Sequence, residues 1–563
     1  MTTAGSWTLP IIFCGAFLLR LVLMQARGDF LEFDETFYLL IARSLLAGDG
    51  LTMNGLPQIA FPPLSALVDA GLGLLSKNLL VISRVASCLM GAATIFPAAA
   101  LARRAFGDTE RILTALLVAV MPSLITFVPV GRTYAESLYF GPEPLYVLLF
   151  LAAGLWLARA SADRRPRDAA LGGLLAGLTY LTRNEAVSFI AAGAALLAFS
   201  AKRRWLLALV FAGAAAVAAM PYLIYLHEVT GAWTLSGKTG SAVLIRESIV
   251  SKVRDGDPTA FEALHYGLSE DGTAMRSSYW GFDAAAGGST AGESALFDVT
   301  FSSALENAEI YLTTMLPILI PWALWPFALV GTIHALTRRG GTSEFDRAHH
   351  GAMWSLLAML VPSLTVCLLL FVEPRHHLYL VPLLAILSAH GFAWTASAVG
   401  PRLRRFVWGA AALVIAGLLG LTLSQLVLAR RQPAELEYAG AIRRMGEAIS
   451  RTLPPEEPIM TWHPALAYYA DRPWRVMPSA SLARIASYAA RRNVRYLVFE
   501  TAVSGPPPGG DPATPFSLVQ IGGMTPERIA AGGFTLRRIE SGPLFASFAM
   551  EDAAGGGDSG RPR

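Results

Sequence analysis

Long apolar runs separated by short polar clusters dominate the pattern along the chain. A helix needs about 20 apolar residues to cross a bilayer. The pattern predicts eleven such crossings, at residues 7–24, 79–101, 112–130, 144–159, 169–182, 186–201, 205–226, 308–336, 351–372, 378–398 and 406–428. We therefore expect residues 1–429 to form an all-α polytopic membrane module.

Clusters of arginine and lysine between the apolar runs predict the orientation. Short loops rich in these residues stay on the cytoplasmic side of a membrane. With eleven crossings every cluster falls on that side, which places the N-terminus in the cytoplasm and the C-terminus outside. The clusters lie within residues 103–111, 159–167, 202–204, 338–347 and 402–405.

The apolar stretch 169–201 is interrupted by Arg183-Asn184-Glu185. Since basic clusters flank it on both sides, the chain must cross outward and return within it. The outward arm of about 14 residues reaches only about 21 Å, which is less than the ~30 Å hydrocarbon core. We expect Arg183 and Glu185 to lie below the outer membrane surface, beside a charged partner or a wet cavity.

Three segments lack the membrane pattern. Residues 25–78 are expected to form a first outer loop that includes an interfacial helix at 64–75, and residues 227–306 a second outer loop. Residues 430–551 are expected to form a soluble extracytoplasmic α/β domain, and residues 552–563 a disordered tail. Within that domain we predict helices at 434–452 and 481–491 and strands at 458–462 and 494–499.

Composition excludes several classes of protein. The chain has 563 residues, of which 54% are apolar and only 15% charged, whereas soluble domains carry about 25% charged residues. The net charge of +4 is spread over short clusters, so we expect no nucleic-acid partner. All three cysteines lie inside apolar runs, which provides no disulfide framework.

Charged residues also gather in short segments on the predicted outer side. Opposite charges at membrane depth are typical of an anionic ligand held by arginines, next to carboxylates that handle protons. Ion pairs that fix helix packing are the alternative interpretation. The segments are Arg132 with Glu136 and Glu143, Arg183 with Glu185, Glu373 with Arg375, and the pair Asp34-Glu35 at a predicted helix start.

The order of these motifs resembles that of the GT-C glycosyltransferases. The closer similarity is to the bacterial family that includes the lipid A aminoarabinose transferase and relatives of the protein O-mannosyltransferases. The matching pieces are Phe33-Asp34-Glu35-Thr36-Phe37-Tyr38, Phe61-Pro62-Pro63-Leu64, Ser83-Arg84-Val85, Gly141-Pro142-Glu143-Pro144-Leu145, Ala176-Gly177-Leu178-Thr179-Tyr180-Leu181-Thr182-Arg183 and Glu373-Pro374-Arg375-His376-His377-Leu378-Tyr379-Leu380-Val381-Pro382.

The resemblance implies transfer of a sugar from a polyprenyl-phosphate donor to a hydroxyl group of a glycan, lipid or protein. The reaction would occur at the outer face of the bacterial cytoplasmic membrane, among membrane lipids. Asp34 is expected to be the general base, with Glu35 beside it and Glu143 as the second acid of the site. Candidates for donor phosphate binding are Arg375, Arg183, Arg84 and Lys238. Candidates for acceptor or sugar binding are Arg132, Glu136, Tyr139 and His376.

The chain departs from the aminoarabinose transferase pattern at one position. That transferase has a phosphate-contacting lysine before its Pro-Pro pair, where this chain has Phe61. Another cation must then take its place, and Lys77, Lys238 and Arg375 are candidates. No cofactor is implied with certainty. A divalent metal would find its best ligands in His227 and Glu143, whereas His349 and His350 are expected to be solvated.

Two other functions are open from the residues alone. A flippase or transporter of lipid-linked saccharides would place its ionisable residues near the middle of the membrane. A cell-surface polysaccharide polymerase or ligase would depend on arginines in large outer loops and lack the early Asp34-Glu35 pair. The charged residues of this chain lie at one end of the crossings, which favours the glycosyltransferase.

Overall fold

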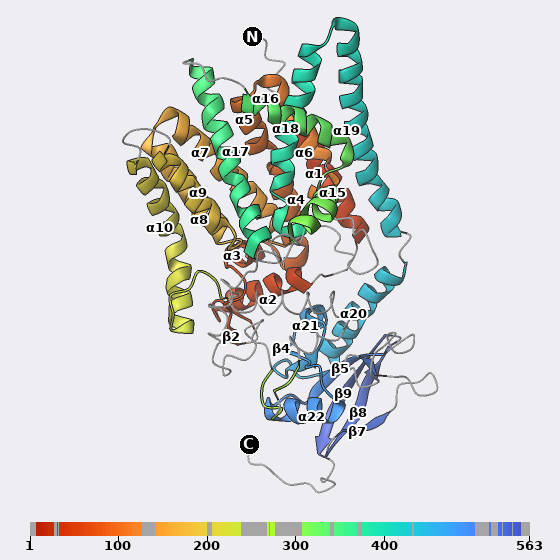
Figure 1. The fold of residues 1–563 in the computed structure, drawn as a ribbon. Helices are drawn as coiled ribbons and strands as arrows, with labels where there is room; N and C mark the ends of the chain where they lie inside the picture. The colour runs from red at the N-terminus through yellow and green to blue at the C-terminus, as the bar shows by residue number, and fades with distance from the viewer. Residues whose placement is uncertain are drawn as a thin grey trace. The chain divides into compact units, whose positions relative to one another are not determined.

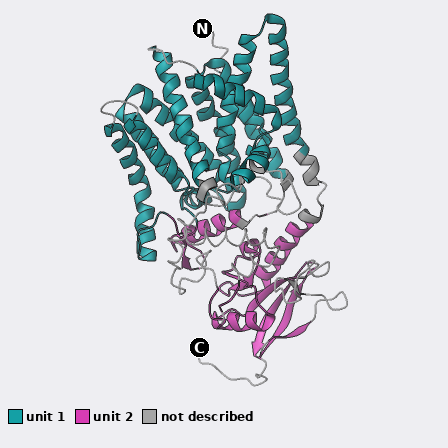
Figure 2. Ribbon diagram, in the orientation of Figure 1, with its two compact units in different colours: residues 1–27, 61–235, 298–431 teal, residues 28–60, 236–297, 432–563 magenta. Residues whose placement is uncertain are grey.

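A computed structural model of the chain divides into two units, shown in different colours in Figure 2. Unit 1 comprises residues 1–27, 61–235 and 298–431, and unit 2 comprises residues 28–60, 236–297 and 432–563. The residues that the structure describes are 7–27, 31, 33–53, 55–125, 141–199, 205–237, 267–269, 271–275, 307–337, 343–369, 374–430, 433–501, 517–518, 527–531, 533–542 and 544–552.

Unit 1 is a bundle of helices (Figure 1). Its α-helices are α1 (Thr8–Arg27), α3 (Leu64–Gly73), α4 (Leu79–Ala93), α5 (Ile95–Ala105), α6 (Asp108–Val120), α7 (Glu143–Asp163), α8 (Pro166–Tyr180), α9 (Ala186–Phe199), α10 (Trp205–Thr230), α15 (Leu316–Leu319), α16 (Trp325–Thr337), α17 (Glu344–Leu369), α18 (Leu380–Ala398) and α19 (Pro401–Arg430). Short helical turns are η2 (Pro122–Leu124), η3 (Tyr311–Met315), η4 (Trp322–Leu324) and η5 (Pro374–His377).

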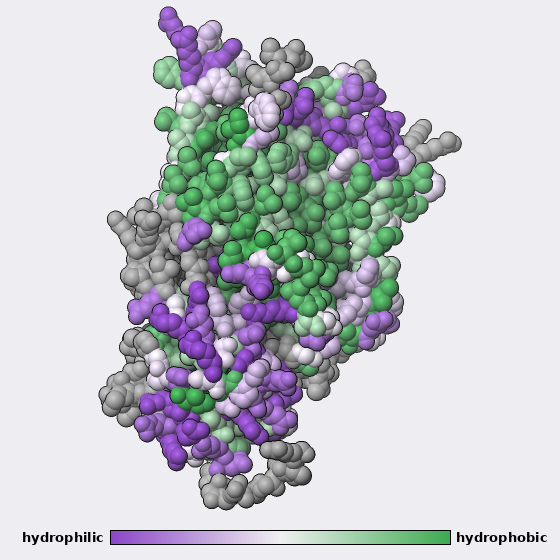
Figure 3. All heavy atoms as spheres, turned by 180° about the vertical axis from the view of Figure 1, so that it is seen from behind, coloured by the Kyte–Doolittle hydropathy of each residue, from purple (hydrophilic) through white to green (hydrophobic). Residues whose placement is uncertain are grey.

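The predicted all-α membrane architecture is confirmed, and the chain is a multi-pass membrane protein. Within the described residues, six helices are long and apolar enough to span a bilayer: Thr8–Gln25, Leu79–Ala105, Glu143–Asp163, Trp205–Thr230, Leu380–Ala398 and Pro401–Ser424. Figure 3 shows hydrophobic side chains covering much of the visible face of unit 1. The total of eleven crossings remains a prediction.

The predicted crossing 308–336 is not one continuous helix. Residues Asn307–Leu319 and Trp322–Thr337 form two helical segments that meet at an angle of 95°. Pro321 lies at the break, with an extended ψ of 135°. Because proline lacks an N–H group and clashes with the preceding turn, it ends the helical hydrogen bonding there.

The interruption at residues 183–185 separates two helices, as the sequence predicted. Helix α8 ends at Tyr180 and α9 begins at Ala186. They contain 15 and 14 residues, so each is shorter than the roughly 20 residues of a full crossing. We call residues 181–185 between them the hinge.

Helices α16 and α18 approach each other through glycines. A Cβ atom added to Gly391 would lie 1.9 Å from the Phe327 carbonyl oxygen, and one added to Gly331 would lie 2.0 Å from the Leu387 carbonyl oxygen. No side chain fits in this space. Small residues of this kind let backbones of membrane helices pack closely.

Replacing Gly391 with alanine is therefore expected to separate α16 from α18 and to destabilise unit 1. Overpacking of this kind costs about 1–3 kcal/mol. The measurement is thermal unfolding of the purified protein in detergent. The matched control is Gly409→Ala in α19, where an added Cβ meets nothing within 4 Å. An equal effect of the two substitutions would contradict this account of the contact.

The expectation that His349 is solvated is wrong. Its side chain is buried, with 2% exposure, and its Nδ1 lies 2.7 Å from the Ala105 carbonyl oxygen. Its ring also meets that of Phe106 edge to face. The histidine falls on the inner face of α17 because the helix continues from Glu344 into its apolar part without a break.

Unit 2 contains a mixed sheet in the order β4-β3-β5-β9-β8-β7, with β6 paired to β5. Strands β3, β4 and β5 run parallel, whereas β9, β8 and β7 continue the sheet in antiparallel fashion. The strands are β3 (Ile459–Thr461), β4 (Trp474–Val476), β5 (Tyr496–Thr501), β6 (Ser517–Leu518), β7 (Arg528–Ala531), β8 (Phe534–Ser541) and β9 (Phe545–Asp552).

Three helices connect or cover this sheet: α20 (Pro433–Thr452), α21 (Pro464–Ala470) and α22 (Leu482–Arg491). Helix α20, strand β3, helix α22 and strand β5 match the four predicted elements. The α/β nature of the domain is thus confirmed, and its location outside the cytoplasm remains a prediction. Residues 553–563, which hold nearly all of the predicted disordered tail, lie outside the described residues.

Part of the first predicted outer loop belongs to unit 2. Residues 28–60 contain helix α2 (Phe33–Ala47) and the short hairpin of β1 (Thr52–Met53) and β2 (Leu56–Pro57). The sequence expectation had kept this segment with the membrane module. By contrast, α3 (Leu64–Gly73) belongs to unit 1, close to the predicted interfacial helix at 64–75.

Candidate functional site

A buried chain of charged side chains joins three segments of unit 1. Arg183 donates one hydrogen bond to Glu143 Oε1 at 2.7 Å and another to Glu185 Oε1 at 3.1 Å. The same Glu185 oxygen lies 2.7 Å from His376 Nδ1. The side chains of these four residues are only 6–14% exposed. We call these four residues the charged cluster.

The start of α7 supplies Glu143. Pro142 precedes the helix and Pro144 follows Glu143, which favours a helix start because the first-turn N–H groups need no helical partner. Glu143 thus lies in the first turn, where the helix dipole favours a carboxylate. A Cβ atom on Gly141 would lie 2.8 Å from Glu143 Oε2, so the carboxylate folds back over a glycine.

The hinge supplies Arg183 and Glu185, and a second backbone segment holds it in place. The Leu64 amide, at the start of α3, donates a hydrogen bond to the Leu181 carbonyl oxygen at 2.9 Å. A first-turn amide has no partner within its own helix, and Leu181 satisfies it. The segment after the Pro62-Pro63 pair is thereby fixed against the hinge.

The short turn η5 (Pro374–His377) supplies the last member. The two adjacent histidines have different partners, as expected for neighbouring residues. His376 lies against Glu185, whereas His377 Nδ1 lies 3.0 Å from Ser363 Oγ in α17. Ser363 Oγ in turn lies 2.5 Å from the Tyr379 hydroxyl. The histidine pair therefore does not converge on one ion.

Electrostatics favour the ionised form of Glu185. Burial alone would raise the pKa of Glu185, but the Arg183 guanidinium and His376 outweigh it and hold that pKa well below its usual value. Arg375 also acts on Arg183 through a repulsive charge interaction. Two arginines and two glutamates therefore lie in one region of unit 1, and their formal charges balance.

Sequence reasoning missed Tyr146, which lies one turn after Glu143 on α7. Its side chain is 1% exposed, and the Arg183 guanidinium lies 5.9 Å from the centre of its ring. Its hydroxyl is buried and makes no hydrogen bond to the described residues. Leaving such a group without a partner costs about 1–3 kcal/mol, so the hydroxyl marks a place for a ligand or water.

Asp34 and Glu35 lie in unit 2, in the first turn of α2, as the sequence predicted. Neighbouring residues on a helix face different directions, and their burial differs accordingly. Glu35 is 4% exposed, whereas Asp34 is only half-buried. Of the two carboxylates, Asp34 is therefore the more accessible to a substrate.

Helix α2 is fixed to the C-terminal α/β segment within unit 2. Phe37 stacks on Trp474 of β4, with ring centres 5.5 Å apart. Arg43 donates hydrogen bonds to the Tyr468 carbonyl oxygen at 2.8 Å and to Asp471 at 3.1 Å. Its guanidinium also lies 3.7 Å from the centre of the Tyr468 ring. The helix that carries the acidic pair thus packs on the C-terminal α/β segment.

Two further arginines lie inside unit 1. Arg84 on α4 is 4% exposed, and Arg20 on α1, which sequence reasoning missed, is 3% exposed. Arg20 donates hydrogen bonds to the carbonyl oxygens of Ala16 and Ala119. The sequence could have indicated Arg20 as a functional candidate, because it is the one charged residue within the predicted crossing 7–24.

The remaining predicted positions are buried and apolar, exposed, or outside the described part of the chain. Phe61 is 2% exposed, so the position of the missing lysine is an apolar contact. Lys77 is exposed. The residues Lys238, Arg132, Glu136, Tyr139 and Glu373 lie outside the described part of the chain.

The described residues offer little to a metal ion. Among them, no group of three or more His, Cys, Asp or Glu side chains is arranged to hold one. Glu143 binds Arg183, and the His227 ring stacks flat on Trp233 with centres 4.4 Å apart. Neither candidate metal ligand is supported by its surroundings.

Solved structures of membrane proteins share this fold. ArnT from Cupriavidus metallidurans bound to undecaprenyl phosphate has 14% sequence identity and a TM-score of 0.55, with 97% of this chain and 98% of that chain covered. The archaeal oligosaccharyltransferase AglB from Archaeoglobus fulgidus, in complex with an inhibitory peptide and a dolichol-phosphate, has 14% identity and a TM-score of 0.52, with coverages of 89% and 70%. No curated protein matches the sequence.

The chain therefore has the fold of the GT-C membrane glycosyltransferases. Residues 61–225 match the family model described as dolichyl-phosphate-mannose-protein mannosyltransferase. This segment contains Glu143, Arg183 and Glu185 of the charged cluster. The predicted enzyme class, a glycosyltransferase, is confirmed by the family match over these residues together with the fold.

Proposed function

We propose that the protein transfers a sugar from a polyprenyl-phosphate donor to an acceptor hydroxyl at the outer face of the bacterial cytoplasmic membrane. The observation that carries the proposal is the shared fold over 97% of the chain with a protein that was solved bound to undecaprenyl phosphate. The buried charged cluster, of which Glu143, Arg183 and Glu185 lie within residues 61–225, supports it, because Arg183 provides a cation at a place that sequence reasoning puts below the membrane surface.

The chemistry requires a base and a cationic site. The acceptor oxygen attacks the anomeric carbon of the sugar while its proton passes to a carboxylate. The bond between that carbon and the phosphate oxygen breaks, and the polyprenyl phosphate leaves with an additional negative charge. We assign the base to Asp34, whose carboxylate is accessible at a helix start, and stabilisation of the leaving phosphate to arginines.

Arg375 and Arg183 would have different roles in the reaction. Arg183 already binds Glu143 and Glu185, so it organises the cluster. Arg375 is only half-buried and lies in a turn of four residues. A planar guanidinium there is suited to bind a phosphate through two N–H groups. It would take the place of the phosphate-contacting lysine that the aminoarabinose transferase has where this chain has Phe61. Glu143 and His376 would orient the sugar or the acceptor.

Replacing Arg375 with glutamine is expected to weaken binding of undecaprenyl phosphate by roughly 10- to 100-fold. A hydrogen bond to a charged group contributes about 1.5–3 kcal/mol, and 1.4 kcal/mol corresponds to about tenfold. Native mass spectrometry with undecaprenyl phosphate measures the affinity. The control is Arg443→Gln on α20, whose side chain is 45% exposed and pairs with Glu447. Unchanged affinity of the Arg375 variant would contradict its assignment.

A further inference from the structure

The opposite end of α7 contains a separate basic pocket. The helix has 21 residues, so its two ends lie about 30 Å apart, and Glu143 is at the far end. The pocket has a volume of about 430 Å³ and lies where α5, α7 and α8 end or begin. It is lined by Arg104, Trp156, Arg159, Asp163, Arg165, Arg167, Asp168 and Leu171.

The charges of the pocket do not cancel. Its four arginines and two aspartates give a net charge of +2. Arg104 pairs with Asp163 at 2.6 Å, and Arg167 lies 3.6 Å from Asp168. Within the described part of the chain, neither Arg159 nor Arg165 forms an ion pair with a carboxylate. The pocket therefore has a net positive charge that can bind an anionic ligand.

Arg159 is held in a fixed orientation. Its guanidinium lies over the Trp156 ring, 4.5 Å from the ring centre. Stacking on an aromatic face leaves the edge of a guanidinium available for a bidentate contact with a phosphate. Arg165 lies directly before the start of α8 and adds a second guanidinium to the pocket.

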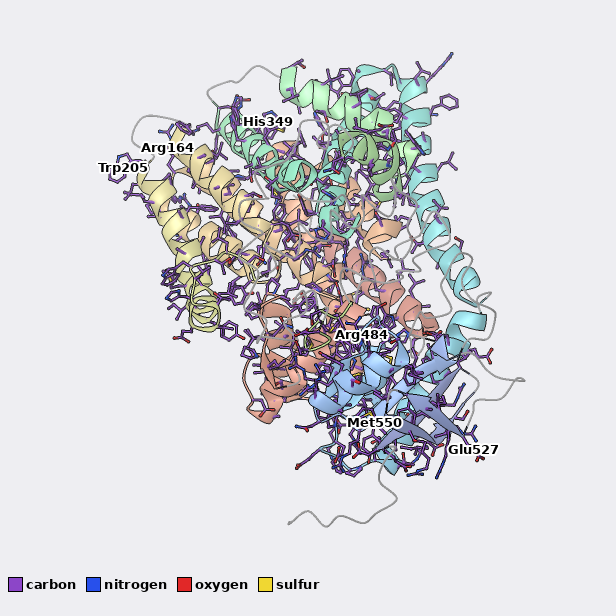
Figure 4. All side chains as sticks on the ribbon, turned by 60° about the horizontal axis from the view of Figure 1, so that its bottom comes forward. Arg164, Trp205, His349, Arg484, Glu527 and Met550 are labelled. Atoms are coloured by element: carbon purple, nitrogen blue, oxygen red, sulfur yellow. The ribbon has the colours of Figure 1, made fainter. Side chains whose placement is uncertain are left out.

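The surroundings favour a phosphate that belongs to a lipid. Leu171 is 40% exposed beside the arginines, and Trp205, at the nearby start of α10, is 60% exposed. Figure 4 labels Arg164, in the turn between α7 and α8, near Trp205. Exposed Trp and Leu beside arginines at the ends of membrane helices are typical of the headgroup region.

We propose that this pocket binds the phosphate of an anionic glycerophospholipid. Arg159 and Arg165 would grip the phosphate, and the acyl chains would lie along the apolar surfaces of α7 and α8. Basic pockets between membrane helices on the cytoplasmic side bind such headgroups, and the positions of the arginine clusters predict that side for this pocket. The site is separate from the proposed catalytic chemistry and does not depend on it.

The test compares lipid binding by the full-length protein in detergent, using native mass spectrometry. Phosphatidylglycerol, phosphatidylcholine and inorganic phosphate are added separately. The triple substitution Arg159→Gln, Arg165→Gln and Arg167→Gln is expected to weaken phosphatidylglycerol binding by at least roughly tenfold, since each basic residue near a membrane surface contributes about 1 kcal/mol. Arg159→Lys keeps the charge and should lose only part of the affinity. The matched control is Arg402→Gln with Arg405→Gln, two exposed arginines at the start of α19.

A preference for phosphatidylglycerol over phosphatidylcholine that the triple substitution removes and the control keeps would support the proposal. Equal binding of both lipids by the wild type would overturn it, and so would an unchanged preference in the triple variant. If inorganic phosphate alone binds in a way that depends on these arginines, without any lipid preference, the ligand is soluble phosphate and the lipid assignment is wrong.

Discussion

Asp34→Asn is expected to lower the rate of sugar transfer by about 10²–10⁴-fold, the usual contribution of a general base. Asparagine has the same shape as aspartate but cannot accept the proton of the acceptor. The first turn of α2 should remain intact, because asparagine is also a good residue at a helix start. Binding of undecaprenyl phosphate and the unfolding temperature are therefore expected to stay close to those of the wild type.

Asp49→Asn is the matched control, because Asp49 is exposed just beyond the end of α2. It should leave transfer unchanged. Glu35→Gln is a useful comparison, since Glu35 is buried in the same helical turn. We expect that substitution to affect stability more than the chemical step. If the Asp34→Asn variant transfers sugar at the wild-type rate, the assignment of Asp34 as the general base is wrong.

Arg183→Leu is expected to lower the free energy of unfolding of unit 1 by roughly 3–5 kcal/mol. The substitution removes the cation that Glu143 and Glu185 share, and removing one partner of a buried ion pair is strongly destabilising. Thermal unfolding in detergent measures the change. Because the pKa of Glu185 is lowered in the folded protein, its ionic contribution is complete above its ordinary pKa of 4.5 and is lost as the pH falls through the lowered value.

The matched control for Arg183 is Arg443→Leu, which breaks an exposed pair with Glu447 at 2.7 Å. Surface pairs contribute about 0–1 kcal/mol. Adding Glu143→Gln and Glu185→Gln to Arg183→Leu should restore part of the lost stability, since the buried charges are then absent. If Arg183→Leu costs no more than Arg443→Leu, the charged cluster does not hold the three segments together.

The hydrophobic pattern was sufficient to predict most helices of unit 1, because each apolar run must satisfy its own backbone hydrogen bonds in a membrane. It could not predict the 95° break between Leu319 and Trp322, since a proline in an apolar run also occurs in kinked helices that continue. It also failed for His349, because burial inside a bundle depends on which helices pack together, and hydropathy does not report that.

The charged segments of the site were predicted individually, but their pairing was not. Within the described residues, Arg183 binds Glu143 of α7 in addition to Glu185 of its own hinge. Such contacts join positions 40 residues apart in the sequence and follow from tertiary packing. For the same reason the sequence did not reveal that α2, with Asp34, packs on the C-terminal segment through Arg43 and Phe37. Short strands such as β4 were also missed, since three residues show little periodicity.

The most direct test of the proposed function is release of polyprenyl phosphate. Purified protein in lipid nanodiscs is incubated with a panel of undecaprenyl-phosphate sugars, with and without candidate acceptors, and free undecaprenyl phosphate is quantified by mass spectrometry. We predict that at least one donor is consumed by the wild type and that Asp34→Asn reduces this by two orders of magnitude or more. If no donor in the panel is consumed, or if the variant releases lipid phosphate as fast as the wild type, the proposed reaction is contradicted.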